Sequence, residues 1–211
     1  LYYKDTPPEI RDELWRRFEF GIRPLKEAGK LRAVHFQFPH WFKPTREARL
    51  HIEACRDRLA QYRLSVEFRS IGWFDGRRNA ETLAWERANE LVHVVVDEPQ
   101  GSARSIPQVW AATRPDLAIV RLHGRNAQTW DSDAPTASER FNYDYPDAEL
   151  VELAASIRAL ALEVAELHVV FNNNYGDQGQ RNAASMMAIL GLSPPEAGRD
   201  GPTLAGLPAA D

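Results

Sequence analysis

The sequence has very little cysteine, and this lack excludes two kinds of stabilisation. Cys55 is the single cysteine among 211 residues. An intrachain disulfide and a thiolate metal cluster therefore cannot form. Because 44% of the residues are hydrophobic, a chain of this length can instead be held together by one ordinary core. The shortage of cysteine also fits a reducing compartment, and we expect a cytoplasmic protein.

Long apolar runs and an excess of positive charge are also missing. No stretch approaches the roughly 20 apolar residues of a membrane-spanning helix, and neither terminus shows a secretory signal pattern. We therefore expect no membrane insertion. The formal net charge of -4 argues against bulk nucleic-acid binding through phosphate neutralisation, although it leaves a local basic cleft open.

Short apolar segments alternate with amphipathic segments along most of the chain. The apolar ones are bounded by proline, glycine or polar residues, whereas the amphipathic ones carry apolar residues every three or four positions. Such alternation predicts an α/β fold with a parallel sheet covered by helices. We expect strands at 33–39, 64–69, 91–99, 117–125 and 166–174, and helices at 9–29, 45–60, 79–90, 147–162 and 180–191.

Every expected strand changes abruptly from apolar to polar residues at its carboxyl end. In a β/α barrel such residues converge on one mouth, whereas an open sheet uses mainly the point where its strand order reverses. Polar ends on all five strands therefore favour a β/α barrel of TIM type. The residues are Gln37 and His40, Glu67 and Arg69, Asp97 and Glu98, Arg121, His123 and Arg125, and Asn172 to Asn174.

Arginines at these strand ends suggest a pocket for an anion. Guanidinium groups match the oxygens of a carboxylate or a phosphate. The alternative is a structural network in which the arginines pair with neighbouring carboxylates. The arginines are Arg69, Arg121, Arg125 and Arg181, and the carboxylates are Glu67, Asp97 and Glu98.

His123 ends an apolar strand and titrates near neutral pH if its pKa is unperturbed. We take His123 and Glu67 as candidate catalytic residues that exchange protons with a substrate. A histidine that merely bonds a carboxylate or a backbone carbonyl is the alternative. The carboxylates could hold a divalent metal, but HxH, HExxH and CxxC spacings are missing. We therefore assign no metal site, and the cofactor stays unknown.

Two further groups of residues complete the candidate site. The segment 172–182 is rich in amides and glycines ahead of a helix, where anions bind, although helix capping is the plainer explanation. Aromatic residues in loops after strands could stack on a sugar or could simply bury apolar surface. The candidate substrate-binding residues are Arg69, Trp73, Asp97, Glu98, Arg121, Arg125, Asn172, Asn173, Gln178, Arg181 and Asn182.

Six motifs occur in one order along the chain: HFQFP, VEFRSIGWF, VVVDEP, VRLHGR, YDY and FNNNYGDQGQRNA. From Ala33 to Leu192 the chain thereby resembles the YecE-like family, a domain of unknown function numbered 72. The resemblance implies a TIM-type barrel and names no activity, cofactor or substrate. The family's opening part, a strand with glycine, serine and tryptophan followed by two more strands, has no counterpart before Leu1. The resemblance therefore implies an incomplete barrel of about five of eight β/α units.

We expect one barrel-type domain over 1–192, shortened at its N-terminus relative to the family, and a flexible tail over 193–211 that is rich in proline, glycine and alanine. Such a barrel exposes two sheet edges, which favour self-association. Three hypotheses for its function follow. The first is an enzyme that binds a small anionic or sugar-like substrate at the carboxyl ends of the strands. The second is a non-catalytic module that binds a ligand or a partner, and the third is an inactive truncated remnant.

Overall fold

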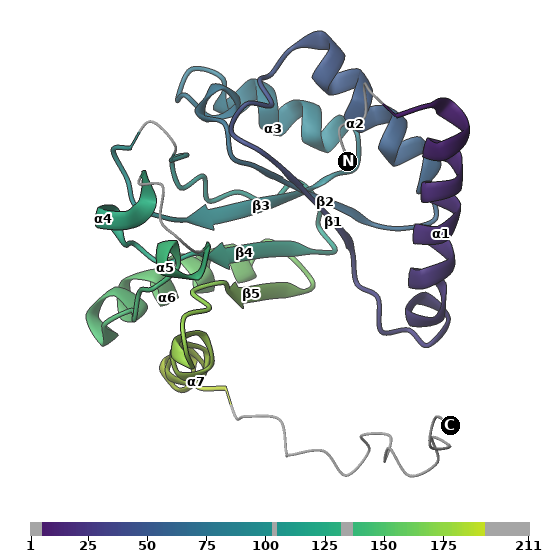
Figure 1. The fold of residues 1–211 in the computed structure, drawn as a ribbon. Helices are drawn as coiled ribbons and strands as arrows, with labels where there is room; N and C mark the ends of the chain where they lie inside the picture. The colour runs from purple at the N-terminus through teal and green to yellow at the C-terminus, as the bar shows by residue number, and fades with distance from the viewer. Residues whose placement is uncertain (1–5, 103–104, 132–136, 193–211) are drawn as a thin grey trace, which may run out of the picture.

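A single parallel sheet forms the centre of the fold. The computed structural model describes residues 6–102, 105–131 and 137–192 of the chain. Five strands follow the order β1-β2-β3-β4-β5, and every neighbouring pair is parallel (Figure 1). The strands are β1 Val34–Phe38, β2 Leu64–Phe68, β3 Val92–Asp97, β4 Ala118–Leu122 and β5 Leu167–Phe171.

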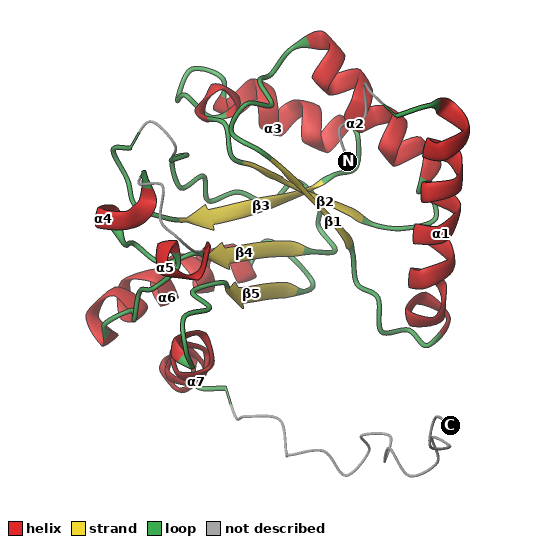
Figure 2. Ribbon diagram, in the orientation of Figure 1, coloured by secondary structure: helices red, strands yellow, loops and turns green. Residues whose placement is uncertain are grey.

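Helices connect most of the strands and are coloured red in Figure 2. Helix α2 starts after Thr45, whose hydroxyl accepts a hydrogen bond from the amide of Ala48 at 3.2 Å. Helix α7 ends at Gly191, which takes the left-handed conformation that commonly ends helices. The helices are α1 Pro8–Glu27, α2 Arg46–Arg58, α3 Asn79–Ala88, α4 Ala127–Trp130, α5 Ala137–Arg140, α6 Asp147–Ala161 and α7 Gln178–Leu190, with a 3-10 turn at Ile71–Trp73.

The strand order distinguishes this sheet from a doubly wound one. A doubly wound sheet reverses its order at a switch point, whereas a β/α barrel adds each strand beside the previous one. Within the described residues the order never reverses. The α/β fold of TIM-barrel type is therefore confirmed, with five parallel strands and with β1 and β5 at the two edges.

The predicted elements are all present, and their ends differ by a few residues. One connection differs from the others, because the described residues between β3 and β4 contain no helix. No helix in the described part of the chain has the length and apolar character of a membrane span. The expected tail at 193–211 lies outside the described residues, and the domain bounds and the self-association stay predictions.

The two faces of the sheet differ because side chains alternate along each strand. On β4, Val120 and Leu122 pack against the apolar side of α6. On β2, Val66 and Phe68 join the core beneath α2 and α3. We call this the helix face. The residues between them point the other way, onto what we call the inner face, where the side chains of Glu67 and Arg121 meet.

The turn that follows β4 depends on one glycine. Gly124 has a φ of 88°, a backbone conformation that L side chains rarely adopt. A Cβ added there would lie 2.6 Å from the Cβ of Tyr143 and 3.6 Å from that of Asn173. The turn therefore brings two other segments against the backbone of β4.

We expect Gly124→Ala to lower the free energy of unfolding by about 2–4 kcal/mol, because left-handed strain adds to a steric clash. Urea unfolding monitored by circular dichroism would measure this loss. The matched control is Gly76→Ala, since Gly76 has a φ of 83° but no atom within 4 Å of an added Cβ. The control should lose only about 1–2 kcal/mol from strain. Equal losses in the two variants would contradict the close packing at Gly124.

Candidate functional site

A buried carboxylate lies at the centre of the inner face. Glu67 is 0% exposed, yet four cationic or imidazole groups surround it. The Nη1 atom of Arg121 lies 2.5 Å from Oε2, and Nη1 of Arg69 lies 3.1 Å from Oε1. The Nε2 atoms of His123 and His35 lie 3.2 Å and 3.5 Å from the carboxylate. These four residues come from three different strands or strand ends, which the parallel register aligns.

The pKa of Glu67 is held well below its usual value. Burial acts to raise this pKa, but the nearby imidazoles of His123 and His35 and the charge of Arg121 outweigh burial. Glu67 is therefore a permanent negative charge at neutral pH. It pairs with both Arg69 and Arg121.

The hydrogen bonds of Asn172 fix the proton of His123. A guanidinium can only donate, so the contact of 2.9 Å from Nη2 of Arg121 identifies Oδ1 of Asn172 as the acceptor. The amide nitrogen of Asn172 then faces Nδ1 of His123 at 2.9 Å and donates to it. The imidazole proton must therefore lie on Nε2, which points at Glu67. Burial is the main cause that lowers the pKa of His123 to about 4, so the ring is neutral at pH 7.

A second carboxyl on the inner face behaves differently. Glu98 follows β3, is fully buried, and accepts a hydrogen bond from the amide of Ile106 at 2.7 Å. Its Oε2 lies 2.9 Å from Nη2 of Arg69. Burial raises the pKa of Glu98 to about 7, helped by the negative charges of Glu67 and Asp97 and opposed by Arg69. Glu98 is therefore a carboxyl that changes its charge near neutral pH.

Asp97 lies on the opposite side of the sheet from Glu98. Arg125 donates hydrogen bonds to its carboxylate from Nε at 3.0 Å and from Nη2 at 2.8 Å. The hydroxyl of Tyr145 donates to the same carboxylate at 2.5 Å. The amide of Gln108 also donates to this carboxylate. The two predicted residues Asp97 and Arg125 thus form a separate network on the helix face. The structure places them beside the inner cluster and not within it.

The segment 172–182 divides between the site and the scaffold. Only Asn172 reaches the inner cluster. Asn182 is buried, and its Oδ1 accepts from the amide of Tyr145 at 3.1 Å and from Nδ2 of Asn173 at 2.7 Å. Gln178 donates to Asn142 at 3.0 Å, and Arg181 pairs with Asp144 at 2.8 Å on the exposed surface. Asp177 precedes α7 without a side-chain capping bond, so these amides join loops instead of capping that helix.

Trp73 lies in the core of the helix face. Its ring is fully buried and stacks on Phe68 with the ring centroids 4.0 Å apart. Its indole N–H donates to the carbonyl of Phe42 at 2.9 Å. Aromatic rings that do reach the inner cluster are Trp130, whose ring centroid lies 5.3 Å from the guanidinium carbon of Arg69, and Phe141, whose ring centroid lies 5.8 Å from that of His123.

Sequence reasoning also missed His35 and Tyr145 as parts of the two networks. His35 stands in the middle of an apolar strand, where only strand alternation indicates that its side chain points to the inner face. Tyr145 comes from a loop 22 residues beyond His123, and local sequence contains no signal of its contact with Asp97.

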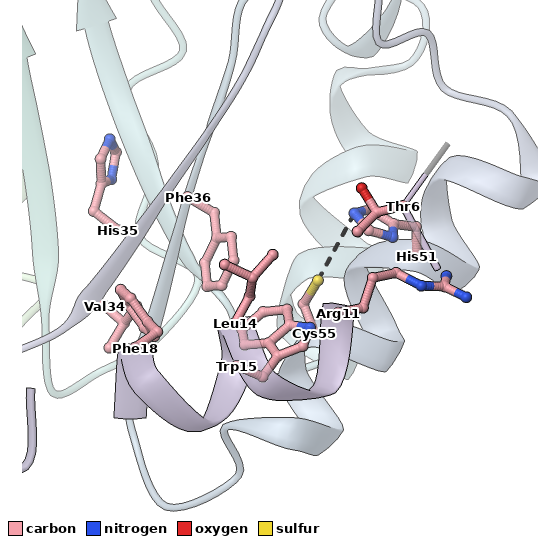
Figure 3. A pocket seen from close by; sticks show the side chains of 10 residues that line it. All are labelled: Thr6, Arg11, Leu14, Trp15, Phe18, Val34, His35, Phe36, His51 and Cys55. Carbon is pink, nitrogen blue, oxygen red and sulfur yellow. Dashed lines mark hydrogen bonds between the residues drawn. The ribbon is translucent and has the colours of Figure 1, made fainter. Parts of the chain in front are cut away.

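A separate hollow lies on the helix face between α1, β1 and α2 (Figure 3). It encloses about 330 Å³ and is lined mainly by apolar side chains. Cys55 points into it with Sγ 3.8 Å from Nε2 of His51, and burial raises the pKa of the thiol to about 11. The thiol is therefore protonated and unreactive. His35 points away from the hollow toward the inner face, and no cluster of potential metal ligands occurs among the described residues.

The titration of Glu98 yields a prediction for stability. Since its pKa is about 7 in the folded protein and 4.5 for an unperturbed carboxyl, its favourable contribution is complete below pH 4.5 and is lost as the pH rises through 7. We expect wild-type protein to lose about 3 kcal/mol relative to Glu98→Gln over this interval. Denaturant unfolding of both proteins at several pH values would measure the difference. Parallel pH profiles would contradict the assigned pKa.

Comparisons with known proteins agree with the motifs found in the sequence. The family described as protein of unknown function DUF72 matches residues 4–205. The UPF0759 protein YunF of Bacillus subtilis (strain 168) is 31% identical over 191 residues, which are 89% of this chain and 68% of that protein.

Solved structures are similar as well. A DUF72 family protein from Enterococcus faecalis V583 has a TM-score of 0.83 at 30% identity, over 92% of this chain and 70% of that one. A DUF72 family protein from Thermotoga maritima MSB8 has a TM-score of 0.76 at 33% identity, over 85% of this chain and 65% of that one. The resemblance expected from the six motifs is confirmed, and the chain belongs to the DUF72 family.

Proposed function

We propose that the chain is an enzyme that binds a small anionic or sugar-like substrate on the inner face, at the carboxyl ends of the strands. The observation that carries this proposal is the convergence of Arg69 and Arg121 on one buried carboxylate, Glu67. The side chains of these arginines are 14% and 15% exposed, so a ligand can reach them. Guanidinium groups held in place in this way are suited to carboxylate and phosphate oxygens.

The charges of the cluster favour an anionic ligand. Arg69 and Arg121 carry two positive charges, and Glu67 supplies one negative charge. When Glu98 is protonated, one positive charge is therefore left on the inner face. A small anion would compensate it in a partly dry environment, where charge pairs are stronger than in water.

Proton transfer in this proposal belongs to Glu98. General acid–base catalysis works best when the pKa of the group lies near the working pH, and the pKa of Glu98 is about 7. His123 is neutral and Glu67 is charged at that pH, so both have fixed states. Catalytic roles for His123 and Glu67 stay predictions. In this proposal the two residues orient Arg69, Arg121 and Asn172.

A non-catalytic binding module is the second candidate, and the geometry of His123 favours it. Its Nδ1 accepts from Asn172 and its Nε2 faces Glu67. Nδ1 is therefore engaged in a hydrogen bond within the protein, and Nε2 is buried 3.2 Å from Glu67 with no hydrogen-bond partner among the described residues. A site of this kind can recognise an anion without using the imidazole in a reaction.

We expect Arg121→Lys to weaken the binding of inorganic phosphate or a phosphorylated sugar at least tenfold, about 1.4 kcal/mol, because lysine keeps the charge but loses the planar fork. Isothermal titration calorimetry would measure the affinity. The matched control is Arg114→Lys, since Arg114 pairs with Asp116 at 2.8 Å ahead of β4, at the other end of that strand. This control should lower thermal stability and leave the affinity unchanged. Equal weakening by both changes, or no anion binding by the wild-type protein, would contradict the proposal.

The variant Glu98→Gln distinguishes an enzyme from a non-catalytic binding module. If the chain is an enzyme, this change should abolish turnover of a bound substrate while the affinity stays within about threefold, since glutamine keeps the shape but cannot exchange the proton. Turnover can be followed by phosphate release from a bound sugar phosphate or by NMR of the mixture. A binding module would show affinity in both proteins and turnover in neither.

A further inference from the structure

The inner cluster and the network around Asp97 share three short pieces of backbone. Glu98 lies on the inner face and its neighbour Asp97 on the helix face. Asn172 reaches His123 on the inner face, whereas Asn173 bonds to Asn182. At the end of β4, His123 points inward, and the left-handed turn at Gly124 sends Arg125 to the helix face. A shift in one network must therefore be felt in the other.

One residue, Tyr145, is linked to all three pieces, to two by its hydroxyl and to the third by its backbone amide through Asn182. The hydroxyl of Tyr145 donates to Asp97 at 2.5 Å and accepts from the amide of Gly124 at 2.9 Å. The backbone amide of Tyr145 donates to Asn182, which in turn accepts from Asn173. Tyr145 is 3% exposed, and its ring packs edge to face against Phe171 on β5 and against Tyr143.

We propose that Tyr145 is a positioning residue for the anion site, because its hydroxyl holds from the helix face the backbone that carries His123 and Glu98 on the inner face. This inference rests on the proposed function of the inner face. Tyr145 itself touches neither Glu67 nor the two inner arginines in the described structure, so it acts through other residues.

The direction of these hydrogen bonds explains why the hydroxyl is needed. The Gly124 amide can only donate, so the tyrosine oxygen must accept there and direct its own proton to Asp97. Removal of the hydroxyl leaves a buried amide without an acceptor, and the backbone next to His123 must then move to find another one. The assignment of the His123 proton depends on one hydrogen bond, the contact of 2.9 Å between the Asn172 amide and Nδ1. Small movements of the ring would therefore change its tautomer.

Tyr143 provides a matched control from the same segment. Its hydroxyl donates to Glu149 at 2.8 Å, and Glu149 also contacts Arg125 at 3.3 Å. Tyr143→Phe therefore removes one hydroxyl from the periphery of the helix-face network and leaves the Gly124 amide bonded. Tyr145→Phe removes the hydroxyl that connects Gly124 with Asp97.

The experiment compares both variants of the full chain by NMR of the ring nitrogens of His123, assigned through the signals that disappear in His123→Asn, and by calorimetry with inorganic phosphate. In wild-type protein and Tyr143→Phe, the nitrogen signals should report one tautomer with the proton on Nε2. In Tyr145→Phe they should move toward a mixture of tautomers, and the Kd for phosphate should rise at least threefold. A general loss of stability alone would not change the tautomer.

Unchanged His123 signals in Tyr145→Phe, or equal changes in both variants, would overturn the positioning role. If wild-type protein binds no phosphate while the His123 signals still respond, the proposed function fails and the positioning of His123 stands. If Tyr145→Phe does not fold, hydrogen exchange in the wild-type protein decides the matter. The Gly124 amide should then be as strongly protected as the β4 amides, and rapid exchange would overturn the inference.

Discussion

The inner face is arranged around a carboxylate that water does not reach. An isolated buried charge is costly, and removal of one partner from a buried ion pair typically costs about 3–5 kcal/mol. The buried charge of Glu67 therefore requires compensation by cationic neighbours. Arg69 and Arg121 supply it from two strand ends. Asn172 and His123 complete the arrangement because Arg121 determines which way the asparagine amide points. One carboxylate thus determines the orientation of two arginines, an amide and an imidazole proton.

The two carboxyls of the inner face differ in charge state because they differ in partners. Glu67 has two arginines and two histidines within 3.5 Å, which outweigh the effect of burial. Among the described residues, Glu98 has Arg69 and a backbone amide as its partners, and burial prevails. The guanidinium of Arg69 therefore contacts both Glu67, whose charge is fixed, and Glu98, whose charge changes near neutral pH. Such separation of neighbouring pKa values is common where carboxyls have different roles in one site.

Most of the fold could be predicted from the sequence, because strand and helix periodicities are local properties. The polar ends of all five strands also indicated correctly that candidate residues meet at the carboxyl edge of the sheet. The division of these residues between two faces was not predicted, although part of it could have been. Asp97 and Glu98 are adjacent in the sequence and so must point to opposite sides of a strand. The contacts of Tyr145 and the burial of Trp73 depend on how loops fold back, and no local pattern contains that information.

The turn at Gly124 determines on which face of the sheet the guanidinium of Arg125 lies. His123 and Arg125 are two residues apart and would share a face if the strand continued. The left-handed backbone between them instead commits the guanidinium of Arg125 to Asp97. A shift of one residue in this turn would deprive Asp97 of its guanidinium partner and could bring a third arginine to the inner face. The length of one short turn therefore affects the electrostatic potential of the strand-end surface, and variation at this position offers a simple route by which related chains could change the charge of that surface.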